Sequence, residues 1–237
     1  MPIYKLKLIG RKEVARDTLE FQFEKPEGFN FKPGQYGGFT LINPPETDAG
    51  GITRRFSLLS MPDDPHLAFV TRLQTSAFKR VLKDLSLESE VKFAGPTGTF
   101  TLHEDAVVPA VLIAGGIGIA PFYSMIRAAV ANRSTQQIIL FYGNREKNDA
   151  AFLSELMQLE EQHPFFKLIP VLEKAEADWH HETGYITDSL LRKYLSDLNA
   201  PIYYICGSPG MVTAIQELLA EMDINPEHVK VEDFPGY

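Results

Sequence analysis

The most constraining feature of this sequence is an apolar run at residues 107–114 that ends in a cluster of glycines. Such a run without polar residues is typical of a strand buried on both faces of a parallel sheet. The glycines permit a tight turn, and Pro121 follows as a residue whose missing N–H costs nothing in the first turn of a helix. Backbone N–H groups and the helix dipole would then face an anion, so the segment predicts a phosphate site. An ordinary strand-to-helix turn is the alternative.

The sequence beyond this point alternates strands with helices, which predicts an α/β domain with a Rossmann-like parallel sheet covered by helices on both faces. Strands are expected at residues 107–114, 137–142, 167–172, 202–206 and 228–232, and helices at 121–132, 149–162, 187–195 and 209–222.

The first hundred residues follow a different pattern, with short alternating runs separated by turn residues. Strands are expected at residues 3–9, 18–23, 39–42, 54–60, 67–73 and 90–94, with one short helix at 76–85. Many short strands and a single helix favour a small antiparallel β-barrel. We therefore predict two domains, at residues 1–103 and 104–237.

Composition excludes several classes of function. A net charge of −8 argues against non-specific nucleic-acid binding, which depends on neutralising phosphates. No apolar run approaches the roughly 18 residues of a membrane span, and the start of the chain has the pattern of a strand instead of a signal peptide. Because Cys206 is the single cysteine, an intrachain disulfide and a Cys-ligated iron–sulfur cluster are excluded, and a reducing, cytoplasmic setting is expected. The adjacent His180 and His181 indicate a solvated loop, and we expect no metal site.

Five motifs stand in a characteristic order along the chain: Arg-Arg-Phe-Ser at 54–57, Gly-Pro-Thr-Gly-Thr-Phe at 95–100, the glycine segment at 115–121, Cys-Gly-Ser-Pro-Gly-Met at 206–211, and the ending at 232–237. Together they resemble the ferredoxin–NADP reductase family. The resemblance covers essentially the whole sequence and implies a flavin-binding barrel followed by a nicotinamide-nucleotide domain, without an iron–sulfur module.

The resemblance assigns the flavin side first. Arg54 would pair with the flavin pyrophosphate, for which a planar, permanently charged guanidinium is suited. Ser57 would donate a hydrogen bond near the flavin nitrogen that accepts hydride. Phe56 stands where tyrosine is more frequent, which retains the aromatic packing but removes a hydroxyl contact to the cofactor.

Two further segments would complete the flavin site. Thr75 and Ser76 correspond to the segment that holds the flavin phosphates, and Ser76 is also suited to cap the helix that follows. Gly95, Thr97 and Gly98 match the glycine turn at the end of the barrel, for which a purely structural role is the alternative. The short helix favours FAD over FMN as the cofactor.

On the nucleotide side, the resemblance assigns the pyrophosphate turn to Gly116, Gly118 and Pro121. The loop after the next strand decides the coenzyme. Arg145, together with Lys147, would suit the 2′-phosphate of NADPH. Glu146 or Asp149 would instead suit the 2′-hydroxyl of NADH. The preference stays open and leans toward NADPH.

The end of the chain contributes the last expected site residues. Cys206 would lie against the nicotinamide carbon that gives up hydride, in a positioning role, and Glu232 would orient the nicotinamide or relay a proton. With Ser57 they form the expected catalytic set. An aromatic residue would cover the flavin, and the sequence leaves open whether it is Phe234 or Tyr237.

The implied activity is hydride transfer from NAD(P)H to FAD, followed by electron transfer to an external acceptor such as a ferredoxin, a flavodoxin, a haem protein or a small oxidant. The alternative is an electron-transfer flavin subunit of a larger redox complex. An acidic partner would need a basic surface, which a set of cationic side chains could supply, although a solvated face is the simpler interpretation. The set comprises Arg11, Lys12, Lys79, Arg80 and Lys83.

Overall fold

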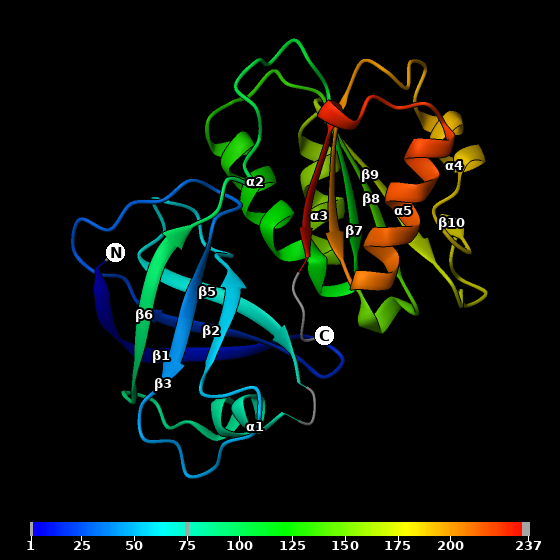
Figure 1. Cartoon of the computed structure of the whole chain (residues 1–237). Helices are drawn as coiled ribbons and strands as arrows, with labels where there is room; N and C mark the ends of the chain where they lie inside the picture. The colour runs from blue at the N-terminus through cyan, green and yellow to red at the C-terminus, as the bar shows by residue number, and fades with distance from the viewer. Residues whose placement is uncertain (1, 74–75, 234–237) are drawn as a thin grey trace.

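The computed structural model describes residues 2–73 and 76–233. It contains two six-stranded sheets, one from each half of the chain (Figure 1). Three residues with expected roles, Thr75, Phe234 and Tyr237, lie outside the described residues.

The first sheet is antiparallel, and its strand order is β4-β3-β6-β1-β2-β5. These strands are β1 (Ile3–Ala15), β2 (Thr18–Glu24), β3 (Tyr36–Leu41), β4 (Thr53–Ser57), β5 (His66–Arg72) and β6 (Glu90–Thr97). The two edges of the sheet meet where the backbone N–H of Leu59, just beyond β4, donates to the carbonyl of Ala68 in β5 at 2.8 Å. The predicted antiparallel β-barrel is therefore confirmed.

Strand β1 is longer than the sequence pattern predicts because it serves two partners. Its first part pairs with β6, its second part pairs with β2, and the register shifts between Leu8 and Gly10. Such a shift bends a strand and increases its twist, which lets one strand turn a corner of the barrel.

The interior of the barrel is packed with aromatic rings. Phe39 lies 4.5 Å from Phe69 and 4.9 Å from Phe93, measured between ring centroids. Phe56 stacks almost parallel on Phe69 at 4.1 Å. Offset and tilted ring pairs of this kind stabilise a core beyond the area that they bury.

Helix α1 (Ala77–Asp84) closes one end of the barrel. Ser76 caps it, since its hydroxyl accepts the backbone N–H of Lys79 at 3.3 Å. Phe78 and Leu82 lie on its buried face, as expected for a short amphipathic helix.

The second sheet is parallel, with the strand order β10-β9-β8-β7-β11-β12. Its strands are β7 (Ala110–Gly115), β8 (Ile138–Asn144), β9 (Phe166–Leu172), β10 (Glu182–Thr183), β11 (Ile202–Gly207) and β12 (Val229–Asp233). Helices α2 (Ile119–Ala131) and α3 (Leu153–Gln162) pack with one apolar cluster of the sheet, and α4 (Asp188–Tyr194) and α5 (Pro209–Glu221) with another. The expected α/β architecture is thus confirmed.

Three predicted boundaries in this half are wrong. Strand β7 begins at Ala110, because Val107 is 89% exposed in the preceding loop. Helix α3 begins at Leu153 because Phe152 has a φ of 60°, a left-handed conformation that interrupts a helix. Helix α2 begins at Ile119, after the 3-10 helix η1 (Gly116–Gly118), so that Pro121 is its third residue.

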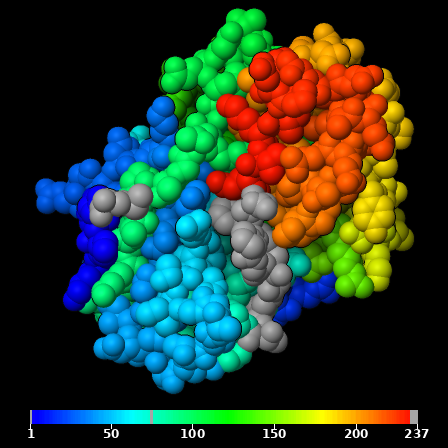
Figure 2. Space-filling model, in the orientation of Figure 1, coloured from blue at the N-terminus to red at the C-terminus, as the bar shows by residue number. Residues whose placement is uncertain are grey.

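Besides a hydrophobic cluster within each half, the structure has one to which both halves contribute. Leu59, Val70 and Phe100 from the first half belong to the same buried cluster as Phe122 and Tyr204 from the second. In the upper part of the space-filling view, the surfaces of the two halves adjoin (Figure 2). The predicted division at 103/104 falls in the segment between β6 and β7 and stays a prediction. Within the described residues, no helix is long and apolar enough to cross a membrane.

Candidate functional site

Strand β7 lies between β8 and β11 in the parallel sheet. From β7 the chain first adds β8, β9 and β10 on one side and then β11 and β12 on the other, so the strand order reverses at β7. Ligands of open α/β sheets bind at the carboxyl ends of the strands beside such a reversal. Gly116, just after β7, has a φ of +53°, which favours glycine. At Gly118, a Cβ atom would lie 2.3 Å from the carbonyl oxygen of Cys206. The glycine turn is therefore pressed directly against the end of β11.

Cys206 and Glu232 lie side by side at this edge. They are register partners in the neighbouring strands β11 and β12, and Cys206 also pairs with Ala114 of β7. The side chain of Cys206 is completely buried and that of Glu232 is half-buried. Parallel strands thus bring together two expected residues that are far apart in the sequence.

The third expected catalytic residue reaches the same place from the barrel. The hydroxyl of Ser57, at the end of β4, donates to the Glu232 carboxylate at 3.4 Å. Gly98 is also close, since a Cβ atom built on it would lie 3.8 Å from a Glu232 oxygen and 2.9 Å from the Tyr36 ring. The site therefore combines Ser57, Cys206 and Glu232 from both halves of the chain.

A pocket of about 560 Å³ lies at the carboxyl ends of β7, β8 and β9. Gly116 and Arg145 line it, as the sequence predicts for a nucleotide site. Sequence analysis missed Arg72, which enters from the barrel, and Glu173, which follows β9. The one feature of the sequence that could have indicated them is their place along the chain: Arg72 is the last residue of a strand and Glu173 directly follows one, and both strands end at this pocket. The pocket is large enough for part of a dinucleotide.

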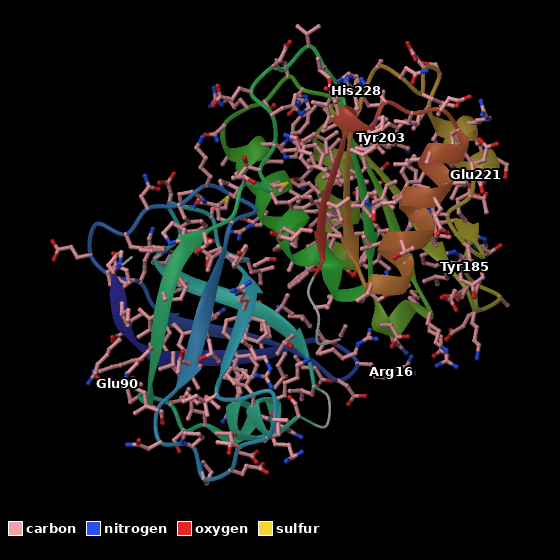
Figure 3. The ribbon with its side chains drawn as sticks, viewed as in Figure 1. Arg16, Glu90, Tyr185, Tyr203, Glu221 and His228 are labelled. Carbon is pink, nitrogen blue, oxygen red and sulfur yellow. The ribbon has the colours of Figure 1, made fainter. Side chains whose placement is uncertain are left out.

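Other polar residues of the expected ribose loop have different partners. The carboxylates of Glu146 and Asp149 both pair with Arg16 of the barrel, at 2.8 and 2.7 Å. The Lys147 ammonium pairs with Asp178 at 3.1 Å. Arg16 lies at the end of the barrel next to the parallel sheet, whereas Tyr185, which lines the pocket, lies near β10 (Figure 3). Of the four expected ribose-site residues, Arg145 alone is among those that line the pocket.

The barrel contains a second group of donors at the start of α1. Arg54 lies 3.4 Å from the carboxylate of Asp48, and its guanidinium lies over the Phe78 ring at 5.3 Å. The other oxygen of Asp48 accepts the backbone N–H of Ala77 at 2.7 Å. This hydrogen bond is the main cause that lowers the pKa of Asp48. The Asp48 carboxylate thus lies between the Arg54 guanidinium and the N-terminus of α1. Because these two donors already bind one anionic group, they also suit a phosphate.

The remaining expected flavin residues have structural contacts as well. Phe56 packs into the aromatic core, and Ser76 is the cap of α1. Thr97 ends β6 opposite Tyr36. Gly95 cannot carry a Cβ atom, which would lie 2.7 Å from the Phe93 ring. These contacts are compatible with the flavin roles.

The expected basic surface is only partly present. Lys79 is 6% exposed and therefore faces the interior. Arg80 pairs with Glu46, and Arg11 donates to the backbone carbonyl of Leu85 at 3.0 Å. Lys12 and Lys83 are exposed. Burial of Lys79 is a correction to the sequence interpretation, which placed it on the surface.

Across the described ranges, no cluster of three or more His, Cys, Asp or Glu side chains could hold a metal ion. In the segment with the adjacent histidines, the Trp179 ring lies 4.9 Å from that of His181, and its indole N–H donates to the Glu182 carbonyl.

Comparisons with known proteins agree with this geometry. Residues 112–217 match the family of oxidoreductase NAD-binding domains. The chain is 31% identical over 221 residues to the ferredoxin–NAD(P)+ reductase component of a naphthalene 1,2-dioxygenase system from Pseudomonas putida, covering 92% of this chain and 64% of that protein. It is 27% identical to ferredoxin–NADP reductase B of Sorangium cellulosum, covering 98% and 97% of the two chains. The chain thus spans less than two thirds of the first of these relatives.

Solved structures show the same architecture. The cytochrome P450 reductase of Amycolatopsis superposes with a TM-score of 0.83 at 27% identity, covering 98% of this chain and 70% of that one. A ferredoxin–NADP+ reductase from Neisseria gonorrhoeae, solved with bound FAD and NADP, has a TM-score of 0.81 at 21% identity and covers 98% of both chains.

The structure joins an antiparallel barrel to a parallel sheet at one polar centre, and the residues of that sheet fall largely within the segment that matches oxidoreductase NAD-binding domains. Over nearly its whole length, the chain is similar to proteins named as ferredoxin–NAD(P)+ reductases.

Proposed function

We propose that the chain is an FAD-dependent NAD(P)H oxidoreductase that delivers electrons to an external acceptor. The observation that carries this proposal is the hydrogen bond of Ser57 to Glu232, which joins the barrel to the strand beside Cys206. Bound FAD would supply the chemistry, namely acceptance of hydride and onward electron transfer.

The residues of the chain supply binding and orientation. Arg54 and the start of α1 would hold the flavin phosphates, with Ser76, Gly95, Thr97 and Gly98 shaping the surrounding turns. Because the donors of a helix N-terminus and a guanidinium are fixed before binding, they need little reorganisation.

The nucleotide would bind along the glycine turn and the pocket beside it. Nothing lies within 4 Å of the Cβ position of Gly116, so the turn is open to a pyrophosphate at this residue. Buried Cys206 would set the position of the nicotinamide. Ser57, which donates its single hydroxyl proton to Glu232 in the flavin-free chain, would donate it to the flavin once the flavin is bound. Glu232 would hold the Ser57 hydroxyl in place or move a proton.

The acceptor is proposed to be a one-electron carrier such as a ferredoxin, a flavodoxin or a haem protein. A second candidate function is that of an electron-transfer subunit in a larger redox complex. Support for it comes from the Pseudomonas putida relative, which is named as the reductase component of a dioxygenase system. We also propose a cytoplasmic location, where the thiol of Cys206 would stay reduced.

Anaerobic mixing of the FAD-loaded chain with NADPH or NADH, followed by flavin absorbance, tests the proposal. Rapid bleaching with at least one coenzyme is expected. Flavin that stays oxidised with both coenzymes would contradict the oxidoreductase function. The subunit function predicts slow turnover with artificial acceptors and a large gain when the physiological acceptor protein is added.

A further inference from the structure

Arg16 lies in the short turn between β1 and β2, at the end of the barrel next to the parallel sheet. Ala15 and Thr18 pair across this turn, and Asp17 completes it with a φ of 53°. The hydroxyl of Thr18 donates to the backbone carbonyl of Arg16 at 3.0 Å. Because the turn is held at both its sides, it presents the Arg16 side chain from a fixed place.

Arg16 binds the segment that follows β8 at three residues. Its backbone N–H donates to the carbonyl of Asn148 at 2.8 Å. Its Nε and one terminal nitrogen donate to the same oxygen of Asp149, at 2.9 and 2.7 Å, and that terminal nitrogen also donates to Glu146 at 2.8 Å. The hydrogen bond with Glu146 is the main cause that raises the pKa of Arg16 further, so the guanidinium stays charged. One side chain of the barrel thus neutralises two carboxylates of this segment.

The same segment begins at the nucleotide pocket. Arg145 lines that pocket, is exposed and forms no ion pair with any residue that the structure describes. Glu146 is its direct neighbour, and Asp149 is only four residues away. A carboxylate released from Arg16 would therefore be within reach of the Arg145 guanidinium, since a few residues of loop span this distance easily.

The charges at the pocket suit a phosphate only while Arg16 holds these carboxylates. Arg72 and Arg145 are the cations that line the pocket, and Glu173 is the one anion among its described lining residues. The loop offers no replacement for Arg145, because Lys147 is paired with Asp178 at 3.1 Å. A phosphate monoester carries nearly two negative charges at neutral pH, so a free carboxylate beside Arg145 would both repel it and compete for its partner.

We propose that Arg16 is a positioning residue that sets the coenzyme preference. By binding Glu146 and Asp149 on the barrel side, it leaves Arg145 available to the 2′-phosphate of NADPH. This inference rests on the proposed function, which places a nicotinamide nucleotide in this pocket. The preference would then depend on a residue that itself need not contact the coenzyme.

The test uses the FAD-loaded full-length chain and two coenzyme fragments without nicotinamide. These are 2′,5′-ADP, which carries the 2′-phosphate, and 5′-AMP, which lacks it. Calorimetric titration gives both dissociation constants, and we expect the wild type to bind 2′,5′-ADP more tightly. Arg16→Met should weaken 2′,5′-ADP binding on the order of tenfold and change 5′-AMP binding by less than about twofold. Lys12→Met, which removes an exposed cation from β1, should match the wild type.

A compensating variant separates the charge of Arg16 from its contribution to the fold. When Arg16→Met is combined with Glu146→Gln and Asp149→Asn, no carboxylate of the segment remains to pair with Arg145. The affinity for 2′,5′-ADP should then return to within about threefold of the wild type. Arg16→Lys keeps a cation at the turn, so it should lose less of the preference than Arg16→Met does.

The outcomes distinguish this inference from the proposed function. Equal weakening of both fragments in Arg16→Met would overturn the inference, and so would a triple variant as weak as Arg16→Met, because Arg16 would then act through the fold of the loop. Unchanged 2′,5′-ADP affinity in Arg16→Met, or a wild type that prefers 5′-AMP, would overturn it as well. A wild type that binds neither fragment and whose flavin stays oxidised with NADPH and NADH would refute the proposed function itself.

Discussion

The hydroxyl of Ser57 and the carboxylate of Glu232 are 3.4 Å apart, although 175 positions separate them in the sequence and they belong to different sheets. Cys206 is the register partner of Glu232 on the adjacent strand. A single polar centre therefore depends on the correct placement of both halves of the molecule.

We predict that Ser57→Ala and Glu232→Gln each slow flavin reduction by NAD(P)H on the order of 100-fold, because each removes a group oriented at the reacting region. Stopped-flow absorbance under anaerobic conditions measures the rate, and FAD content checks that the flavin is retained. Thr53→Ala, which removes an exposed hydroxyl from the same strand, is the control. Unchanged reduction rates in both variants would refute the assigned roles.

Gly118→Ala should disrupt the nucleotide site. Its methyl group would lie 2.3 Å from the Cys206 carbonyl oxygen, so the backbone of β11 or of the turn must shift. We expect a loss of stability of about 1–3 kcal/mol and weaker binding of NADP+. Gly38→Ala is the control, since the atoms nearest its Cβ position are 3.8 Å away, in ordinary van der Waals contact, and Gly38 is not one of the residues that line the pocket. Chemical denaturation and calorimetric titration measure the two effects, and wild-type behaviour of Gly118→Ala would show that the turn is looser than described.

Coenzyme preference should respond in opposite directions to two residues of the pocket. Arg145→Gln removes a cation that can pair with a 2′-phosphate, so it should raise the KM for NADPH more than that for NADH. Glu173→Gln removes a carboxylate that repels a phosphate and can accept a ribose hydroxyl, so it should shift the preference toward NADPH. Steady-state kinetics of both variants, with NADPH and with NADH, measures these changes in KM. Parallel changes in both KM values would place the adenosine ribose elsewhere.

The ion pairs of Arg16 should couple the two halves. Its guanidinium contacts Glu146 and Asp149, and its backbone N–H donates to the carbonyl of Asn148 at 2.8 Å. We expect Arg16→Met to lower the melting temperature modestly at low salt, with a smaller difference in high salt because exposed charges are screened. Lys12→Met, an exposed change on the neighbouring strand β1, serves for comparison. An effect that is independent of salt would indicate lost packing instead of lost charge.

Sequence reasoning predicted those features that repeat a local rule. The apolar run before Gly115 predicted a buried parallel strand. Once the strands were known, Cys206 and Glu232 could be expected together, since carboxyl ends of parallel strands share one edge. The same reasoning anticipated the cap at Ser76 from its residue type.

Features that depend on distant partners could not be predicted this way. No local sequence pattern predicts that Arg16 pairs with Asp149, because the two residues are 133 positions apart. Lys79 stands beside Phe78 on a short helix, where neither residue spacing nor composition separates a buried lysine from an exposed one. The late start of α3 depends on the backbone of Phe152, whose residue type does not favour a positive φ.

The shared hydrophobic core has a consequence for how the molecule unfolds and moves. Leu59 and Val70 are buried together with Phe122, so separating the barrel from the parallel sheet would expose an interior and not merely a boundary. Interfaces of this kind make neighbouring units cooperative. Calorimetry should therefore record one transition, and either half expressed alone should aggregate. Entry and exit of a nucleotide would then depend on loop fluctuations, since the two lobes form a single thermodynamic unit.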